Sequence, residues 1–273
     1  MIELNISERK KIQINLLNEI KKICEKNKIK YFLAYGTLLG AVRHKGFIPW
    51  DDDVDIFLFR EEYDKLIEIL KKNKSNNYKF ISNQIDNYYF PYVKISDLNT
   101  IAVEQNCIFK DGLWIDIFPL DYVPLDKKNQ KRFLKKCNFI RNCTIAMNTD
   151  FSKENNISRK YLRYFLNIIC RIYGRNKIKI KYDKLIKKYK NKYVKEKNAL
   201  ICNLCSPYIY KDVFEKKDLI EQLDFEFEGE KYTSVKNYDF YLNKIYGDYM
   251  KLPPIDKRVS HGVTVYRKEK NEK

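Results

Sequence analysis

Four aspartates crowd into five residues of this chain: Asp51, Asp52, Asp53 and Asp55. Carboxylates this close repel one another, so a folded protein tolerates them where cations or basic side chains neutralise the charge. Hard divalent cations prefer oxygen ligands and share them with substrate phosphates. The cluster therefore predicts a metal site for phosphate chemistry, with Mg2+ as the expected ion and Mn2+ as the alternative.

Alternation along the chain selects among these carboxylates. The β-branched and aromatic run 54–59 predicts a strand. Side chains of a strand alternate between its faces, so Asp53 and Asp55 share one face. Asp51 has the same parity but precedes the strand, which leaves it as an additional candidate ligand. Asp52 is expected to point the other way and to have a structural role.

A third oxygen ligand is expected from Asp116. It is the lone charge in the apolar run 113–118, which predicts a strand ending at Pro119. A buried carboxylate needs a partner, and the alternative is that Asp116 pairs with a lysine or caps a loop. The neighbouring carboxylate cluster favours the ligand role. Asp53, Asp55 and Asp116 are therefore the predicted metal and catalytic residues.

A phosphate-sized cradle lies just upstream. The run 30–35 predicts a strand that stops at Gly36, and Thr37 is expected to cap a short helix. Backbone N–H groups at the start of this helix can hold a phosphate, and Gly40 permits close approach. Three basic residues follow where they could pair with diphosphate oxygens, arginine having the best geometry: Arg43, His44 and Lys45.

Length and composition indicate one compact body. The 273 residues are 44% hydrophobic and contain only 8 glycines and 7 prolines, with no low-complexity linker. Residues 1–11 have no apolar core that could serve as a secretory signal, and no run approaches the roughly 20 apolar residues of a membrane span. Seven scattered cysteines fit a reducing compartment. We therefore expect a cytoplasmic protein with free, mostly buried thiols.

The net charge of +18 is concentrated in the middle and at the C-terminus. Such a surface attracts polyanions, and nucleic acid, anionic lipid headgroups and anionic glycans all qualify. The alternative is a solvated face without a specific partner.

Cys202-x-x-Cys205 could begin a zinc site, but no second pair follows it, and the only histidines are His44 and His261. Zinc is therefore not favoured.

Periodicity outlines the fold. Helices are expected over 7–26 and 60–73, with strands over 78–82, 89–95 and 100–105 between them and the Asp116 run. From 126 to about 197 the periodicity is helical. The simplest assembly is an α+β fold in which helices flank a mixed β-sheet, followed by a mainly helical second half.

One helical segment of this second half has an apolar face flanked by basic residues. The apolar residues are Leu162, Phe165, Leu166, Ile169 and Tyr173, and the basic ones are Arg159, Lys160, Arg163 and Arg171. Such a face could lie on a membrane. Core packing is the favoured interpretation, because apolar helical stripes usually face a core.

Taken together, the run 36–56 closely resembles the LicD family of phosphotransferases, relatives of the fukutin proteins. That family has Gly-(Ser/Thr)-Leu-Leu-Gly-Ala-x-Arg followed by Pro-Trp-Asp-Asp-Asp-x-Asp. The run 115–121, Ile-Asp-Ile-Phe-Pro-Leu-Asp, matches a second family block. Residues 246–261, with Tyr-Gly-Asp-Tyr-Met, Leu-Pro-Pro, Lys-Arg and His261, resemble its C-terminal signature, although Gly262 stands where many members have a second histidine.

The resemblance implies a nucleotidyltransferase-like catalytic core over 1–125 and a mainly helical region over 126–273. The C-terminal segment, about 236–262, would return to complete the active site. It further implies transfer of a substituted phosphate, most often phosphocholine from CDP-choline, to a sugar hydroxyl of a cell-surface glycan such as lipopolysaccharide, teichoic acid or capsule. The partners would be a CDP-alcohol donor and a glycan or glycolipid acceptor, with peripheral membrane association an option and no specific nucleic acid.

The implied mechanism is in-line attack of a sugar hydroxyl on the phosphorus that bears the alcohol, with CMP leaving. Asp116 would orient or deprotonate the hydroxyl, Lys94 and Arg43 would balance phosphate charge, and His261 would close the site. If choline is transferred, its ammonium needs an aromatic pocket, for which the candidates are Tyr88, Tyr89, Tyr92 and Trp114. Packing is the alternative role for each of these rings.

Two other functions use the same features. A nucleotidyltransferase would use the aspartates on an NTP and release pyrophosphate. A basic nucleic-acid-binding protein would bind DNA or RNA with a steep salt dependence that survives loss of Asp53 and Asp55.

Overall fold

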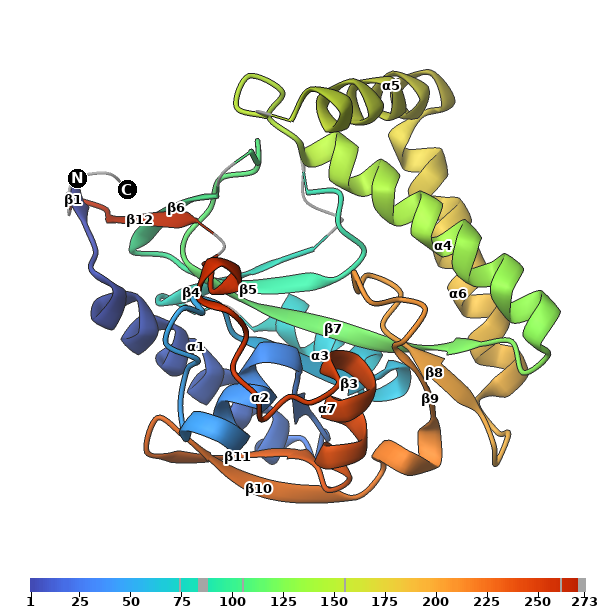
Figure 1. The fold of residues 1–273 in the computed structure, drawn as a ribbon, viewed down its shortest axis with the longest axis horizontal. Helices are drawn as coiled ribbons and strands as arrows, with labels where there is room; N and C mark the ends of the chain where they lie inside the picture. Colours follow the sequence, from blue (N-terminus) through green and yellow to red (C-terminus); the bar gives the residue numbers. More distant parts are fainter. Residues whose placement is uncertain (74, 83–87, 105, 155, 261, 270–273) are drawn as a thin grey trace.

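A mixed β-sheet forms the centre of the molecule (Figure 1). The computed structural model describes residues 1–73, 75–82, 88–104, 106–154, 156–260 and 262–269. In spatial order, the main path of the sheet contains β2 (Phe32–Leu33), β3 (Asp55–Phe59), β7 (Trp114–Val123), β5 (Val93–Asp97) and β4 (Tyr78–Ile81). β3 and β7 run parallel, and the other pairs on this path are antiparallel. The predicted mixed sheet is therefore confirmed.

Helices α1 (Ile6–Lys26), α2 (Tyr35–His44) and α3 (Arg60–Lys72) cover one face of this sheet (Figure 1). α1 begins with a capping box in which Asn5 and Glu8 exchange side-chain-to-backbone hydrogen bonds. Its apolar stripe packs with α3 and the sheet in one core, which includes Leu17, Ile20, Leu66, Ile115 and Ile117. Because Ile115 and Ile117 face this core, Asp116 belongs to the opposite face.

The strand containing Asp116 was predicted to end at Pro119, but it continues to Val123. The backbone N–H of Asp116 donates to the O of Val54, the residue before β3, so every second N–H of β7 points toward β3. Position 119 points to the other side, where pairing with β5 stops at Ile117. The missing proline N–H therefore removes no ladder hydrogen bond.

Two other strand boundaries were predicted too long. The strand expected over 89–95 begins only at Val93, because residues 89–92 form no ladder. The strand expected over 30–35 is reduced to Phe32–Leu33, since α2 already begins at Tyr35. The strands expected over 78–82 and 100–105 are β4 and β6 (Thr100–Glu104), and residue 105 lies outside the described residues.

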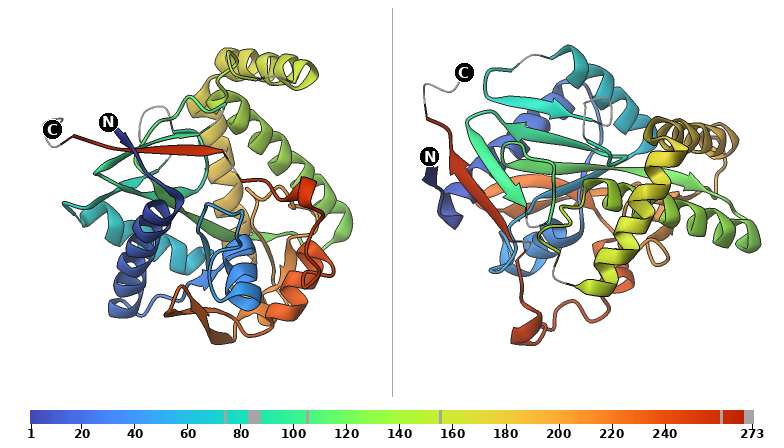
Figure 2. Two further views of the ribbon diagram at one scale, coloured as in Figure 1. Left: turned by 60° about the vertical axis from the view of Figure 1, so that its left-hand side comes forward. Right: turned by 90° about the horizontal axis from the view of Figure 1, so that it is seen from above.

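The second half begins with the predicted helices. α4 (Lys127–Asn148), α5 (Ile157–Tyr173) and α6 (Arg175–Tyr193) stand beside the sheet, with α5 at the outer end of the group (Figures 1 and 2). The prediction that the apolar face of α5 packs into a core is wrong for its most apolar side chains. Leu162, Phe165 and Tyr173 are exposed, and no described element covers them.

The remaining chain adds short elements and returns to the sheet. β8 (Leu200–Cys202) pairs with β7 and β9 (Val213–Glu215) pairs with β8, so the second half extends the central sheet. A hairpin follows from β10 (Gln222–Phe227) and β11 (Glu230–Val235), and then α7 (Tyr238–Tyr246). Two 3-10 turns, η1 (Lys216–Leu219) and η2 (Ile255–Lys257), interrupt the loops.

The chain ends meet in a small separate sheet. β12 (Val263–Arg267) pairs with both β1 (Ile2–Glu3) and β6. This pairing carries the segment after α7 back across the molecule to the face of the central sheet that α1, α2 and α3 leave uncovered (Figure 2, left). The division at residue 125 stays a prediction, since strands from both sides of it share one sheet.

Candidate active site

Asp55, Asp116 and Lys94 form one row across three adjacent strands. Asp55 and Asp116 are register partners in the parallel pair β3–β7, and Lys94 is the antiparallel partner of Asp116 in β5. The Lys94 Nζ lies 3.0 Å from Asp116 Oδ1. Two carboxylates and one ammonium thus lie side by side on the face opposite the helix-covered core. Lys94 itself is buried.

The Asp55 carboxylate lies in an unfavourable electrostatic environment. Burial raises the pKa of Asp55 well above its usual value, and the charges of Asp53, Asp116 and Asp51 raise it further, whereas Lys94 lowers it. The predicted alternation holds around β3, because Val54 and Ile56 are buried while Asp53 and Asp55 are half-buried. Lys94 therefore only partly offsets the negative charge around Asp55.

The start of α2 lies against the aspartate cluster. A Cβ at Gly36 would collide with the carboxylate of Asp51, so the absent side chain lets that carboxylate reach the first turn of the helix. Thr37 was predicted to cap the helix, but the N-cap residue of α2 is Ala34. The Thr37 hydroxyl instead accepts a hydrogen bond of 2.8 Å from the N–H of Asp55. This contact fixes the aspartate strand to the helix.

The other predicted donor-binding residues on α2 have partners within the protein. A Cβ at Gly40 would strike the carbonyl of Gly46, so the close approach at this position is made by the following loop. The Arg43 guanidinium donates to Tyr249 O at 2.6 Å and to His44 Nε2 at 3.0 Å. Burial lowers the pKa of both Arg43 and His44. Their contact with a donor phosphate stays a prediction.

The C-terminal segment reaches the aspartates through side chains that sequence reasoning did not single out. Burial raises the pKa of Tyr246, with further contributions from Tyr208 and from the negative charges of Asp55, Asp51 and Asp53. The Arg258 guanidinium lies 5.0 Å from the ring centre of Trp50, next to Asp51. Both residues belong to the C-terminal block, and the block itself was the available signal. His261 lies outside the described residues.

The four rings considered for a choline pocket do not share one site. Tyr92 and Trp114 flank Lys94, whose Nζ is 5.8 Å and 3.9 Å from the two ring centres. Tyr88 is buried in an aromatic cluster with Phe90 and Phe109. Tyr89 accepts a hydrogen bond of 2.5 Å from Arg175. Tyr88 also packs against Tyr92, with ring centres 6.3 Å apart, so three of the four rings lie near the carboxylate row, and Tyr92 and Trp114 contact Lys94 directly.

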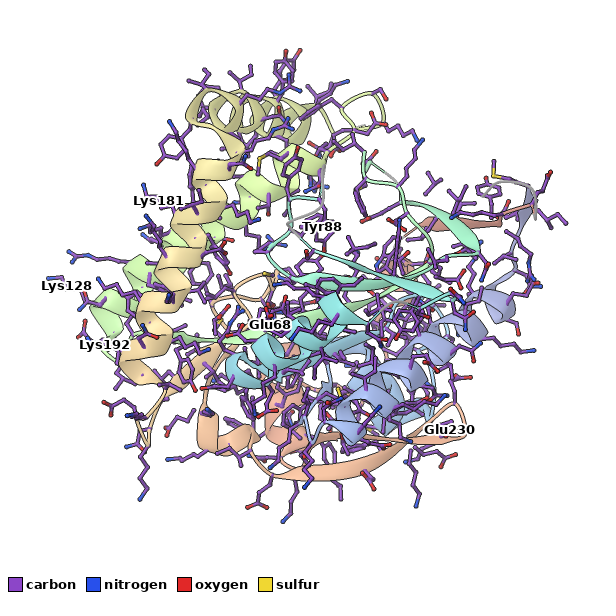
Figure 3. The ribbon with its side chains drawn as sticks, turned by 180° about the vertical axis from the view of Figure 1, so that it is seen from behind. Glu68, Tyr88, Lys128, Lys181, Lys192 and Glu230 are labelled. Atoms are coloured by element: carbon purple, nitrogen blue, oxygen red, sulfur yellow. The ribbon has the colours of Figure 1, made fainter. Side chains whose placement is uncertain are left out.

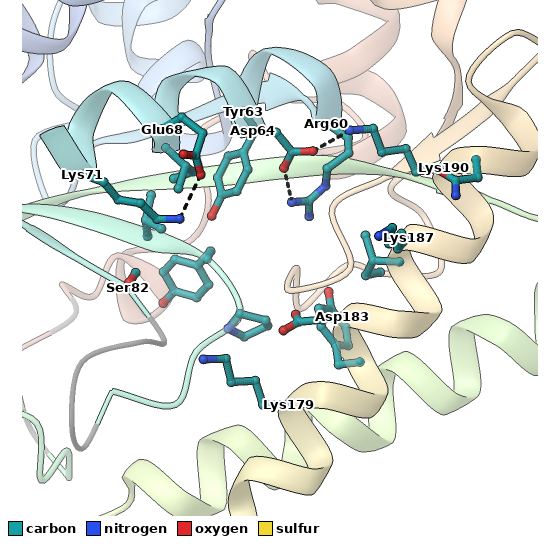
Figure 4. A pocket seen from close by; sticks show the side chains of 17 residues that line it. Arg60, Tyr63, Asp64, Glu68, Lys71, Ser82, Lys179, Asp183, Lys187 and Lys190 are labelled. Atoms are coloured by element: carbon teal, nitrogen blue, oxygen red, sulfur yellow. Dashed lines mark hydrogen bonds and ion pairs between the residues drawn. The ribbon is translucent and has the colours of Figure 1, made fainter.

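A cavity of about 430 Å³ lies elsewhere, between α3, α6 and residues 91–93. In this cavity Asp64 joins Arg60 and Lys190 by ion pairs of 3.2 Å and 2.6 Å (Figure 4). None of Asp53, Asp55 and Asp116 lines it. Of the residues beside the carboxylate row, Tyr92 also lines this cavity.

The donor set of the row suits a hard cation, because it consists of carboxylate oxygens under mutual repulsion. Asp55 and Asp116 provide two neighbouring ligands of this kind. Within the described part of the chain, however, no three Asp, Glu, His or Cys side chains converge in an arrangement that could hold a metal ion. A third protein ligand is therefore not in place, and Cys202 and Cys205 belong to no such group either. All seven cysteines are free, and six are buried, as predicted.

A mixed sheet with paired carboxylates on one face and a helix N-terminus beside them defines a nucleotidyltransferase-type catalytic domain. Residues 28–153 match the family model for the LicD/FKTN/FKRP nucleotidyltransferase domain. These residues form a LicD-family domain, and the protein is a transferase.

One curated relative extends this match over nearly the whole chain. The lipopolysaccharide cholinephosphotransferase LicD of Haemophilus influenzae is 29% identical over 269 residues, which cover 96% of this chain and 98% of the relative. An uncharacterised protein of Rickettsia typhi is 42% identical over 81 residues, 29% of this chain and 26% of that protein. Human ribitol 5-phosphate transferase FKRP is 50% identical over 34 residues, 12% of this chain and 7% of that protein.

Sequence reasoning missed two buried acidic groups. Asp121 accepts two hydrogen bonds from Arg60, of 2.6 Å and 2.9 Å, which form a bidentate ion pair. Asp212 accepts a hydrogen bond from the hydroxyl of Tyr35, the first residue of α2. Asp121 belongs to the second family block, which was a signal for it, whereas no pattern in the sequence marks Asp212.

Proposed function

We propose that the protein transfers phosphocholine from a CDP-alcohol donor, CDP-choline, to a sugar hydroxyl of a cell-surface glycan and releases CMP. The row of Asp55, Asp116 and Lys94 is the observation that carries this proposal. It combines the carboxylates and the cation that phosphoryl transfer requires. The relative of nearly equal length, a lipopolysaccharide cholinephosphotransferase, supports phosphocholine as the group and lipopolysaccharide as the acceptor class.

Asp116 is positioned to act on the acceptor. In the proposed step the sugar hydroxyl oxygen forms a bond to the phosphorus that bears choline, and the bond from that phosphorus to the bridging oxygen breaks. The electron pair leaves with CMP, and the hydroxyl proton passes to the Asp116 carboxylate. The ammonium of Lys94 forms an ion pair with the Asp116 carboxylate at 3.0 Å.

Asp55 and Asp116 would hold Mg2+, with Mn2+ as the alternative ion and Asp53 or Asp51 as candidate further ligands. A divalent cation held by these residues would supply positive charge for the phosphate oxygens and the leaving CMP. The electrostatic strain at Asp55 supports the assignment, because a dication relieves the repulsion among the carboxylates. The first turn of α2, with Gly36 and Thr37, offers backbone N–H groups to the donor phosphates.

Tyr92 and Trp114 are the proposed contacts for the donor alcohol. Their rings already accommodate one cation, the Lys94 ammonium, which shows that they can present π faces to positive charge. A choline group would bind beside Lys94, and phosphate would separate the two cations. Arg43 and Arg258, whose charges lie close enough to interact, would balance phosphate charge from the C-terminal side.

The test is a donor panel with a glycolipid acceptor. The protein and Mg2+ are incubated with lipopolysaccharide and CDP-choline, CDP-ethanolamine, CDP-glycerol or CDP-ribitol, and both CMP and modified lipopolysaccharide are measured. Acceptor-dependent CMP release with CDP-choline, and retention of the choline label on the glycan, are expected. Pyrophosphate release from an NTP, without CMP release from any CDP-alcohol, would overturn the proposal in favour of nucleotide transfer.

A further inference from the structure

An exposed apolar stripe runs the length of α5. Its members recur at spacings of three or four residues, which places them on one face of the helix, and their exposed fractions lie between 40% and 83%: Ile157, Tyr161, Phe165, Ile168 and Ile172. The opposite face of α5 is tied to α4, where buried Asn167 donates to Ala146 O. A helix with this much uncovered apolar surface marks an interaction site.

The surroundings of the stripe are predominantly basic, although Arg163 forms an ion pair of 2.7 Å with buried Glu154. α5 contains Arg159, Lys160, Arg163 and Arg171 and no acidic residue. The adjoining helix α6 carries nine lysines and arginines and a single acidic residue, Asp183. Lys181 and Lys192 project from α6 away from the body of the molecule (Figure 3). The occupant of the stripe must therefore be apolar where it meets α5 and anionic around it.

We propose that α5 lies in the interface of an anionic phospholipid bilayer, with its apolar stripe toward the acyl chains and its basic residues on the headgroups. Basic amphipathic helices bind membranes in this way. Tyr161 and Tyr164 add exposed rings of the kind that favours the membrane–water interface. A second copy of the chain fits less well, since a symmetric pairing of α5 would bring two strongly basic surfaces together.

The position of α5 suits this role. It lies on the side of the central sheet that α1, α2 and α3 leave uncovered, which is also the side of Asp55 and Asp116 (Figure 1). Binding through α5 therefore brings the bilayer to the side of the molecule that bears the carboxylate row. No helix among the described residues is long and apolar enough to cross a membrane. The inference stands on α5 alone and does not require the proposed reaction.

Vesicle binding tests the inference with the full chain. Flotation is measured with vesicles of phosphatidylglycerol and phosphatidylcholine and with vesicles of phosphatidylcholine alone. Binding to the anionic vesicles, and its loss at high salt, are expected. F165S/I172S should weaken binding at least about tenfold, because both side chains would leave the acyl region. I2S, at a comparably exposed isoleucine in β1, should bind like the original protein.

Charge is tested separately. K160Q/R171Q should weaken binding by about fivefold for each charge removed, whereas K26Q/K30Q, with the same change in net charge on the other side of the sheet, should have little effect. In F165W, quenching by brominated phosphatidylglycerol should place the new indole among the acyl chains.

Absence of flotation with anionic vesicles would overturn the proposal, as would flotation unchanged by F165S/I172S. A dimer that F165S/I172S converts to a monomer, without vesicle binding, would assign the stripe to a second copy instead. Since these readouts contain no nucleotide, failure of the donor panel leaves them unaffected.

Discussion

Asp55 and Asp116 lie directly beside each other as register partners. They belong to β3 and β7, the parallel strand pair that connects the two carboxylate motifs in the described residues. Parallel register brings together residues that are distant in sequence, and both lie on the face opposite the helix-covered core. The buried ammonium of Lys94 is paired with the second of them. The site is therefore a property of the strand register rather than of the aspartate cluster alone.

Each of the two carboxylates is expected to be needed for transfer. Asp55→Asn and Asp116→Asn should each reduce acceptor-dependent CMP release by at least about a hundredfold, because the amide replaces an anionic ligand and, at Asp116, the proton acceptor. Asp224→Asn, at an exposed position on β10, is the matched control and should retain activity. Full activity in either of the first two variants would refute the assignment.

The same two substitutions should change stability in opposite directions. Asp55→Asn removes a half-buried charge that three other carboxylates repel, so the free energy of unfolding at neutral pH should rise. Asp116→Asn leaves buried Lys94 without its partner, and should lower that free energy by about 2 kcal/mol, less than the roughly 3–5 kcal/mol typical of a broken buried pair because repulsion at Asp55 is also relieved. Urea unfolding without added metal measures both, and two changes of the same sign would contradict this account.

Removal of divalent cations should mimic loss of the carboxylates. Chelation is expected to abolish CMP release, and Mg2+ or Mn2+ should restore it. Added Mg2+ should also raise the melting temperature of the protein but have a much smaller effect on Asp55→Asn, because ligand binding to the folded state stabilises it. Undiminished CMP release in the presence of a chelator would show that the reaction does not use a metal ion.

Sequence patterns were sufficient where the chemistry is local. Alternation along 53–56 correctly separates buried Val54 and Ile56 from half-buried Asp53 and Asp55, and helical periodicity correctly locates α1 and α3. Asp116 could be singled out as the lone charge in an apolar run. Its neighbours in the sheet could not be predicted, because they depend on the order of the strands. That Lys94 would be its partner follows from the pairing of β5 with β7, which no local pattern specifies.

Long-range packing explains where the patterns were insufficient. Gly40 was predicted to allow the close approach of a phosphate, but the carbonyl of Gly46 occupies the space beside it. The apolar face of α5 was assigned to a core because periodicity reports that a helix is amphipathic and not what covers it. The role of Asp212 could not be predicted, since its partner Tyr35 lies far away in sequence. Tyr35 also begins α2 with a positive φ of 41°, a backbone conformation that the sequence did not indicate.

The Arg60–Asp121 pair should be a major contribution to stability. Arg60→Met leaves the Asp121 carboxylate, which is only 1% exposed, without its bidentate partner, and should lower the free energy of unfolding by about 3–5 kcal/mol. Lys65→Met on the same helix breaks an exposed ion pair with Glu62 and should cost less than about 1 kcal/mol. Equal losses in urea unfolding would show that the buried pair has no special weight.

Asp212 should make stability depend on pH. Burial raises its pKa to about 7, so the folded state retains this proton where the unfolded state has lost it. Stability contributed by the group is therefore present below its unfolded pKa and is lost as the pH rises toward 7. Asp212→Asn keeps an oxygen that can accept from Tyr35 but cannot ionise. The free energy of unfolding of this variant minus that of the original protein should therefore grow by up to about 4 kcal/mol between pH 4 and pH 7. Above pH 7 this difference should stay constant.

Tyr35 sets the upper end of that pH range. Its hydroxyl donates to Asp212 and lowers the pKa of the carboxyl, partly opposing the effect of burial. Tyr35→Phe removes the donor, so the pKa of Asp212 should rise further and the loss of stability should continue above pH 7. Chemical unfolding at a series of pH values compares the two variants with the original protein. A pH profile of Tyr35→Phe that levels off at the same pH as the original would show that another group is responsible for the titration.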